Sequence, residues 1–194
     1  MSISKLDAVN TCISTIGLGL VSSLTTPSRF VAAALTLLDK TSNAVQDIGW
    51  WFNTEPDITL PPSLTGEVVI PGDVSTMVPQ LARFVQRGSR VYDLTAASYI
   101  PAAPVKCSLI RRLDWDLLPP VAREYIAAKS AYHFAIAYDA GATKLQVLKA
   151  EMEEVRKQFM TQHIRSSRVN MNEQGGMGMA RLRARHGLYG GSNG

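Results

Sequence analysis

The sequence predicts an α+β fold in which an antiparallel helical bundle is built from both ends of the chain and a small antiparallel β lobe is inserted between them. Apolar residues recur at helical spacing near both ends, whereas the middle alternates short β-prone runs with Pro and Gly. Neither helical half can bury its apolar stripe alone. We therefore predict a discontinuous helical lobe of residues 1–49 and 118–167, a β-rich lobe of residues 50–117, and a flexible Gly- and Arg-rich C-terminal tail of residues 168–194.

The composition is that of a globular protein, with 46% hydrophobic and 19% charged residues in 194. Two cysteines, Cys12 and Cys107, lie among apolar neighbours. Two are too few for a disulfide framework, and no CxxC pair suggests zinc, so we predict reduced thiols in the core. The uncharged run that begins at residue 11 is short and interrupted by Gly and Ser, which predicts a soluble cytoplasmic protein without a membrane segment.

Two helices are predicted before the β-rich region. The first covers about 4–16, with Ser4 as a candidate N-cap and glycines just past its end. The second covers about 28–48, with Ser28 as N-cap and Gly49 where a C-terminal cap belongs.

Short β-prone runs follow, which we read as strands separated by turns: WWFN, DITLPP, EVVIPGD, RFVQRGSRVYD and VKCSLIRRL. The clearest is RFVQRGSRVYD, which predicts a hairpin of two strands around Gly88. Together these runs predict a small antiparallel sheet with long loops.

The tryptophan pair at 50–51 stands where the second helix leads into the β-rich region. Neighbouring strand residues point to opposite faces, so we expect only one of Trp50 and Trp51 to enter the helical core. The other would cover the sheet or face a neighbour. Large aromatic side chains near this junction and in the β-rich region are the candidates for anchoring the two lobes to each other: Trp50, Trp51, Phe52, Tyr92 and Trp115.

Two helices are also predicted after the β-rich region. The first has Pro119 and Pro120 in its first turn and ends at Gly141. The second follows with Thr143 as N-cap. Its apolar stripe alternates in steps of three and four, as in an antiparallel bundle: Leu145, Leu148, Met152, Val155 and Phe159.

The positive charge is confined to the end of the chain. Residues 1–164 carry fifteen basic and fifteen acidic side chains, whereas residues 165–194 carry five arginines against one acid, Glu173. This pattern predicts a neutral body with a basic tail that docks on an acidic protein groove or on phosphates, the alternative being a solvated tail. The arginines taken as docking candidates are Arg168, Arg181, Arg183 and Arg185.

Motifs of known catalytic chemistry are missing from the sequence: it contains no GxSxG, HExxH or GxxxxGK[ST]. His133, His163 and His186 lie far apart and are expected to be structural. Asp114 and Asp116 could share a proton or bind a cation, but they lead directly into a helix, so we favour a capping role. We therefore predict no catalytic residue, no cofactor, no metal site and no enzymatic activity.

Several stretches, in order and at comparable spacing, resemble the tail tubular protein A family of short-tailed bacteriophages. They are GWWFNTE, ITLPP, RGSRVYD and LDWDLLPPVAREYIAAKSAYHF, and the resemblance runs from about Ala8 to Phe159. The Gly- and Arg-rich run past about residue 167 departs from the family pattern.

The resemblance implies a structural virion protein of the phage tail, assembled in the host cytoplasm. It implies an adaptor ring of twelve copies between the portal protein and the tail nozzle protein (tail tubular protein B). It further implies that tail fibres attach near the ring–nozzle junction, that DNA passes non-specifically through the bore, and that the C-terminal segment with the four arginines faces the portal. No membrane and no cofactor are involved. A neutral body suits such a conduit, because each neutralised phosphate adds affinity that would slow passage.

Two other functions are consistent with parts of the sequence. The arginine-rich tail could make the protein a nucleic-acid-binding protein. An acid pair such as Asp114 and Asp116 could instead serve a tail-associated glycan hydrolase, which we rank below the other two.

Overall fold

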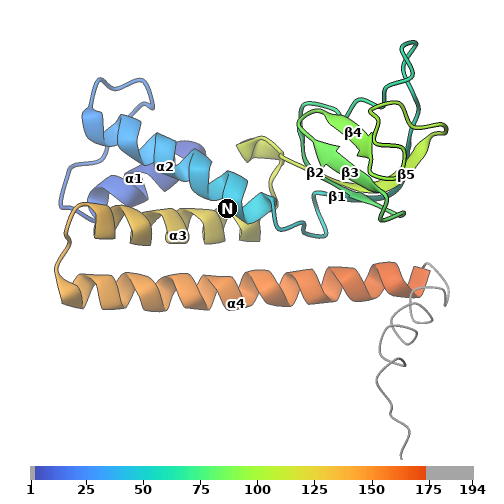
Figure 1. Ribbon diagram of the computed structural model, residues 1–194. Helices are drawn as coiled ribbons and strands as arrows, with labels where there is room; N and C mark the ends of the chain where they lie inside the picture. The colour runs from blue at the N-terminus through green and yellow to red at the C-terminus, as the bar shows by residue number, and fades with distance from the viewer. Residues whose placement is uncertain (1–2, 174–194) are drawn as a thin grey trace, which may run out of the picture.

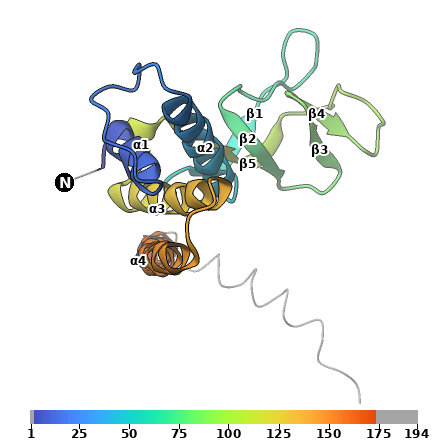
Figure 2. The same ribbon diagram turned by 90° about the vertical axis from the view of Figure 1, so that its left-hand side faces the viewer.

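The computed structural model describes residues 3–173, with side chains described to residue 167. In this part of the chain, helices and strands are separated in space: the helices lie at one end and two small sheets at the other (Figure 1; Figure 2). The mixed helical and antiparallel sheet content agrees with the predicted α+β class. No helix in the described range is both long enough and apolar enough to cross a membrane.

The first two helices begin at the predicted caps. Helix α1 (Lys5–Ser14) opens with a capping box, in which the Ser4 hydroxyl accepts the backbone N–H of Asp7 and the Asp7 carboxylate accepts that of Ser4. The hydrogen bonds from Ser4 lower the pKa of Asp7. Helix α2 (Arg29–Gln46) starts after Ser28, whose hydroxyl accepts the N–H of the second helical residue. Both N-cap predictions are confirmed.

The last two helices match the sequence less closely. Helix α3 (Pro120–Ala137) carries Pro120 in its first turn, as predicted, but Pro119 is its N-cap residue and the helix ends at Ala137 rather than at Gly141. Helix α4 (Ala142–Glu173) begins before Thr143, so Thr143 is not its N-cap; instead the Gly141 carbonyl accepts the first intrahelical bond. The helix also continues past the predicted boundary at 168, because no Gly or Pro occurs before residue 175 to end it.

The four helices share one buried apolar cluster, the helical cluster. Helices α3 and α4 lie side by side and run in opposite directions, and α1 and α2 cover the other side of α3 (Figure 1; Figure 2). Fully buried members come from all four helices, for example Val9, Leu38, Ile126 and Phe159. Residues at both ends of the range 50–117, including Trp50 and Trp115, belong to this cluster as well.

The larger sheet has three strands in the order β1–β5–β2, all antiparallel. The central strand is β5 (Val105–Arg111), with β1 (Thr54–Leu60) and β2 (Val74–Pro79) on either side. The second sheet is the hairpin of β3 (Phe84–Arg87) and β4 (Arg90–Asp93).

Predicted strands were right in the hairpin, in β5 and in the DITL part of β1, and wrong elsewhere. The hairpin turns at Gly88, whose φ of +61° suits glycine. Residues 50–53 (WWFN) form a turn rather than a strand, and EVVI contributes only an isolated bridge at Val69. The edge strand β2 was missed. Its sequence VSTMVP ends in a proline, which argues against a central strand but is tolerated in an edge strand.

A second apolar cluster lies under the sheets and includes Val68, Phe84, Val91, Cys107 and Leu109. Both cysteines are free and buried, one in each cluster, which confirms the prediction of core thiols. Burial raises the pKa of Cys12 to about 12 and that of Cys107 above its ordinary value.

Candidate functional site: the joint between helices and sheets

An aromatic seam attaches α4 to the turn that follows α2. The ring of Phe159, which is fully buried, lies 4.4 Å from that of Trp50 and 5.5 Å from that of Trp51. One turn further along α4, the His163 ring lies 5.1 Å from Trp50 and 5.8 Å from Trp51. Tyr125 of α3 stacks on Phe159 at 5.3 Å. These five residues are the aromatic seam, in which ring pairs each add about 0.5–1.5 kcal/mol beyond the area they bury.

Both tryptophans face the same helix, so the expectation that they point to opposite faces is wrong. Side-chain alternation requires extended backbone, but here the Trp50 carbonyl accepts the N–H groups of Asn53 and Thr54 at 3.2 and 3.1 Å and closes a turn. The Trp50 indole N–H donates to the Val45 carbonyl at 2.6 Å, so its polar atom is satisfied although the residue is buried. Trp51 is half-buried.

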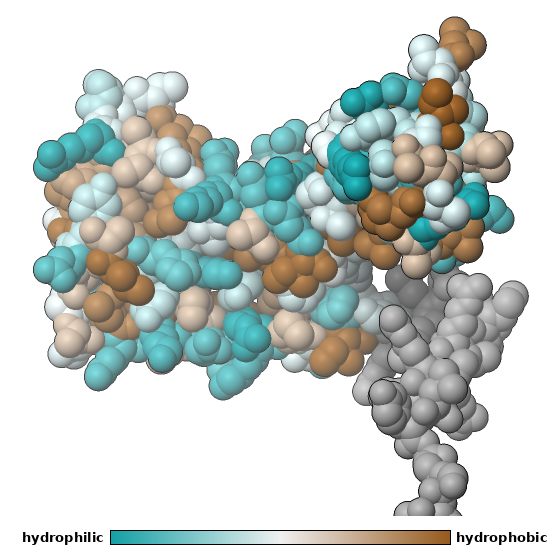
Figure 3. All heavy atoms as spheres, in the orientation of Figure 1, coloured by the Kyte–Doolittle hydropathy of each residue, from teal (hydrophilic) through white to brown (hydrophobic). Residues whose placement is uncertain are grey.

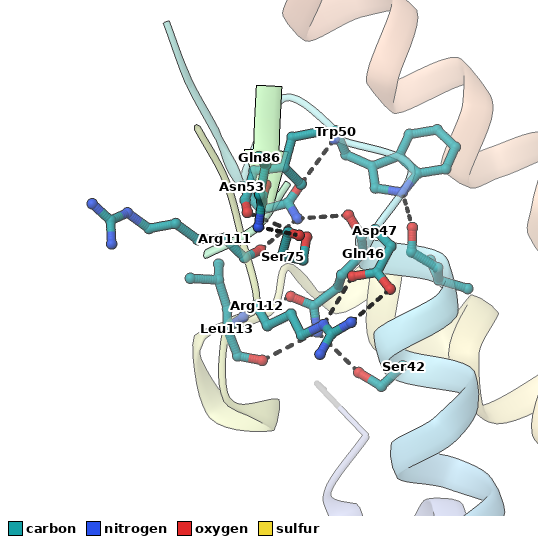
Figure 4. Close-up of polar contacts among 12 residues, drawn as sticks. Ser42, Gln46, Asp47, Trp50, Asn53, Ser75, Gln86, Arg111, Arg112 and Leu113 are labelled. Atoms are coloured by element: carbon teal, nitrogen blue, oxygen red, sulfur yellow. Dashed lines mark hydrogen bonds and ion pairs between the residues drawn. The ribbon is translucent and has the colours of Figure 1, made fainter. Parts of the chain in front are cut away.

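The carboxamide of Gln46 connects the end of α2 to the chain that leaves β5 (Figure 4). Its Oε1 accepts the backbone N–H of Leu113 at 2.7 Å, and its Nε2 donates to the Leu113 carbonyl at 3.1 Å. Nε2 also donates to the Ser42 hydroxyl at 3.0 Å. The side chain therefore pairs with Leu113 much as a neighbouring strand would. Because Gln46 is only 1% exposed, water cannot replace these bonds.

Asn53 makes the second half of this connection. Its Oδ1 accepts the backbone N–H of Trp50 at 2.8 Å, and its Nδ2 donates to the carbonyls of Gln46 at 2.9 Å and Arg111 at 2.7 Å. The backbone of Arg111 in turn donates to the Asn53 carbonyl at 2.9 Å. Gln46 and Asn53, with the backbone groups they bond, form the amide joint, which fixes the two chain segments that pass between helices and sheets.

Ion pairs surround the amide joint on its solvent side. Arg112 binds both carboxylate oxygens of Asp47 at 2.8 Å, and this hydrogen bonding is the main reason that the pKa of Asp47 is lowered. Arg111 binds Asp73 at 2.5 Å and Glu55 at 2.9 Å. These contacts raise the pKa of Arg111, and the pKa of Asp73 is lowered by the same hydrogen bond. Exposed pairs of this kind contribute about 0–1 kcal/mol each.

Gly49 allows the chain to turn tightly between α2 and the seam. Its φ is +83°, and its N–H donates to the Gln46 carbonyl at 3.0 Å, which closes a turn after the helix; the C-cap residue itself is Asp47, not Gly49 as predicted. A Cβ at this position would lie 2.7 Å from Cδ1 of Ile110. The backbone conformation therefore requires glycine, and a larger residue would also push the Ile110 side chain of β5 aside.

The other aromatic candidates for anchoring the lobes are distributed between the two regions. Phe52 lies 5.0 Å from Trp51, beside the seam. Trp115 is buried in the helical cluster, and its indole N–H donates to the Ile3 carbonyl at 3.3 Å. Tyr92 lies elsewhere, in the β3–β4 hairpin. Its ring is 4.9 Å from that of Tyr99 and carries the Arg87 guanidinium at 3.6 Å.

The four arginines predicted to dock on a partner lie at or beyond the end of the described chain. Arg168 is in the last turns of α4, where only the backbone is described. Arg181, Arg183 and Arg185 lie outside the described residues, as does His186.

Asp114 and Asp116 do not cap α3, contrary to prediction. Asp114 is the N-cap residue of a short 3₁₀ helix, η1 (Trp115–Leu117), and Asp116 lies within it; the N-cap position of α3 is occupied by Pro119. Asp114 makes no side-chain capping bond. The Asp116 carboxylate is 93% exposed, 4.0 Å from Arg123. The two acids therefore share no enclosed site.

The described histidines occupy different surroundings. His163 belongs to the aromatic seam, and His133 lies on the exposed face of α3, where partial burial and the nearby Lys129 lower its pKa. Among the described residues, no three His, Cys, Asp or Glu side chains are grouped so that they could hold a metal ion.

Hollows lie along α4 in the described part of the chain. One of about 340 Å³ adjoins the seam and is lined by Trp50, Trp51 and His163 among others. A polar one of about 420 Å³ lies between α4 and the start of α3. An apolar one of about 350 Å³ lies between α1, α3 and the first half of α4. Neither Asp114 nor Asp116 lines any of them.

Sequence reasoning missed Gln46 and Asn53, the residues that do most to connect the two regions. A signal was present for Gln46: Ser42 and Gln46 are four residues apart, next to the apolar stripe that contains Leu38 and Val45. Polar residues so placed in a helix need partners. The partner, Leu113, is 67 residues away, so the sequence could not identify it.

The site thus consists of packed rings, paired amides and ion pairs that set the position of one region against another. Residues 6–169 match the family model described as tail tubular protein, and the chain belongs to this family. The class of protein is therefore a structural component of the bacteriophage tail.

A curated relative agrees with this assignment. Tail tubular protein A of Klebsiella phage KP34 is 22% identical to this chain over 172 residues, which cover 87% of this chain and 91% of the relative. The match confirms the family resemblance that the sequence motifs indicated.

Proposed function

We propose that the protein is a subunit of the adaptor ring of a short phage tail, where it joins the portal to the tail nozzle and lines part of the DNA ejection channel. The observation that carries this proposal is the family match, which spans residues 6–169 and includes the helices, both sheets and the amide joint. In this role the subunit performs no reaction and acts through the surfaces by which it binds its partners.

The architecture supports the proposal through its joint. We take the helical bundle (1–49 and 118–167) as one lobe and the β-rich segment (50–117) as the other. Two chain segments connect them, and Gln46 and Asn53 bond both. A closed ring requires the same geometry from every subunit, since a small angular error per copy accumulates around the circle. Directional hydrogen bonds at the connection supply that constancy.

The expected partners follow from this role. Twelve copies would form the ring, with the portal protein on the helical side, the nozzle protein beneath, and tail fibres near the ring–nozzle junction. Assembly would take place in the host cytoplasm. Residues 1–164 carry fifteen basic and fifteen acidic side chains. Because their net charge is zero, we expect this part of the chain to bind passing DNA only weakly.

Electron microscopy of the purified protein mixed with its portal tests the proposal. We expect a ring of density directly beneath the portal, and the same ring in virions. A protein that remains monomeric with the portal, together with virions that lack the ring, would contradict the adaptor function.

Portal docking is proposed to depend on the C-terminal arginines. Changing Arg181, Arg183 and Arg185 together to Ala should leave the melting temperature unchanged and weaken co-sedimentation with the portal, because arginine forks pair with carboxylates. The control changes three basic residues of α4 to Ala: Lys149, Arg156 and Lys157.

Filter binding of DNA with the same variants separates docking from nucleic-acid binding. If the five tail arginines bind phosphates, the log–log salt slope should approach about −4 to −5, and the triple variant, which keeps Arg165 and Arg168, should reduce its magnitude by about 3. Unchanged portal co-sedimentation with lost DNA binding would favour the nucleic-acid function over the adaptor contact.

A further inference from the structure

A single leucine stands fully exposed at the tip of a loop that projects from the sheets. Leu64 lies between β1 and β2, in the teal loop at the upper right of Figure 1, and its relative exposure of 109% exceeds that of every other large apolar residue in the described chain. Figure 3 shows hydrophobic colouring at the end of this projection. One exposed leucine is not by itself evidence of a partner; Leu64 is notable because the loop that carries it is ordered and projects from the sheets.

The loop is ordered by its own hydrogen bonds. The Ser63 N–H donates to the Glu67 carbonyl at 2.8 Å, and the Gly66 N–H donates to the Ser63 carbonyl at 2.9 Å. The hydroxyls of Ser63 and Thr65 lie 2.8 Å apart. At the base, the Glu67 carboxylate accepts a bond from Arg90 of β4 at 2.7 Å. A turn that is already ordered loses little conformational entropy on binding.

Two further features hold the loop in its projecting position. Pro61 and Pro62 form its stem, and proline fixes the backbone φ angle. Gly66 has a φ of +83° and leaves room for Ile100, whose Cγ2 would lie 2.8 Å from a Cβ at that position. Leu64 is therefore presented outward by a braced turn.

The apolar hollow between α1, α3 and α4 is a matching concave feature. It has a volume of about 350 Å³, with Ala127, Ala128 and Ala131 of α3 on one side and Leu148 and Val155 of α4 on the other. Alanines are too short to fill the space between the two helices here. Of the α4 side chains from 142 to 167, only Phe159 is fully buried, and it lies beyond this hollow.

Charges near the two features are complementary. Glu124 and Glu151 line the hollow, and neither forms an ion pair among the described residues. At the sheet end, Arg87 is exposed and pairs across the hairpin with Arg90, next to the base of the loop. In the described part of the chain Arg87 contacts the Tyr92 ring but no carboxylate. A contact between the loop of one copy and the hollow of another would bring Arg87 toward Glu124 and Glu151.

We propose that Leu64 of one subunit inserts into the hollow between α1, α3 and α4 of a neighbouring copy of this chain. This inference rests on the proposed ring and names a contact between its subunits. The loop projects from the sheet end of the molecule (Figure 1), whereas the hollow is lined by α1, α3 and α4, so we place the contact between two copies of the chain. A projection and a complementary hollow on different faces of one molecule give head-to-tail contacts, which form a ring if the rotation closes.

Disulfide trapping between copies tests the contact. The variants L64C and E151C are mixed at high concentration, with and without the portal, and oxidised mildly. We expect a disulfide-linked dimer only in the mixture, and a ladder of larger species when both changes are in one chain. The native Cys12 and Cys107 are buried at 0% exposure and do not compete. The control pairs E151C with L20C, since Leu20 is 73% exposed on a different loop.

A second variant measures the contribution of the side chain itself. L64D should keep the wild-type melting temperature and weaken self-association by about tenfold or more, because a leucine would no longer be buried in the contact. L20D should associate like the wild type. Two outcomes would overturn the inference and leave the adaptor function standing. In the first, rings form equally well with L64D. In the second, L64C cross-links to the portal and not to E151C of another copy. Trapped dimers without any ring beneath the portal would support the contact between copies and contradict the adaptor function.

Discussion

The aromatic seam and the amide joint lie side by side but hold different elements in place by different interactions. The seam holds α4 through ring contacts around Phe159, which depend on buried area and tolerate a range of angles. The joint holds the sheets to the helices through the carboxamides of Gln46 and Asn53, whose bonds require a defined direction. The seam therefore provides stability, and the joint provides geometry.

The seam also contains the most deeply buried attachment of α4, beside which Met152, Val155 and Met160 pack against the helical cluster. Phe159 is the one fully buried side chain of α4 between 142 and 167, and it lies where Trp50, Trp51 and Tyr125 converge. The rest of the helix keeps large exposed surfaces, including Val147 at 53% exposure. Such a helix is available for contacts with partners.

Loss of the Phe159 ring should have the largest effect on stability. F159A removes the centre of the seam and leaves a cavity among four other rings, so we expect the free energy of unfolding to fall by about 3–5 kcal/mol. Denaturant unfolding followed by tryptophan fluorescence measures it. V147A, on an exposed part of α4, is the control and should change stability by less than about 0.5 kcal/mol. A native-like F159A would mean that the seam does not hold α4.

Asn53 tests the joint. N53D keeps the shape but turns a donor toward the carbonyls of Gln46 and Arg111 into an acceptor, at a site only 3% exposed. We expect a loss of about 1–3 kcal/mol or more at pH 7. Part of it should be recovered at low pH, because a protonated carboxyl can donate again.

The matched control for this change is N43D on the exposed face of α2. Melting curves between pH 4 and 8 compare the two variants. Equal stability of N53D and the wild type at pH 7 would show that the joint tolerates a broken bond. In that case ring closure could not depend on it.

The ion pair beside the joint should have the smallest effect. R112A removes the bidentate partner of Asp47, and for an exposed pair we expect a loss of up to about 1 kcal/mol. The pKa of Asp47 lies below its ordinary value of 3.8 in the folded protein, so the pair contributes above that value and its contribution is lost as the pH falls through the lower, folded pKa. The difference between wild type and R112A in urea midpoints should therefore shrink on acidification; a constant difference would point to packing instead of charge.

The sequence predicted those parts of the fold that depend on neighbouring residues. Ser4 and Ser28 were recognised as N-caps, and the turn at Gly88 was recognised from its flanking strands. The stripe of α4 was also correct, since Leu145, Leu148, Met152 and Val155 are half-buried and Phe159 fully buried. Each of these features depends on residues within one or two turns of each other.

The misses have a common origin in contacts between distant residues. Trp50 and Trp51 could be assigned to one face only once residues 50–53 were known to form a turn, and that turn is bonded to β5. Strand β2 is held by its pairing with β5.

The sequence by itself determined the four helices, the N-caps of the first two, the buried thiols, the neutral body with its basic end, and the family to which the chain belongs. Only the tertiary structure decided that Gln46 bonds Leu113, that Asn53 bonds Arg111, and that an unfilled apolar hollow remains over the alanines of α3. The physical reason is that helix caps and apolar periodicity are local properties of the chain. A buried amide or a cavity is defined by atoms that folding brings together from far apart.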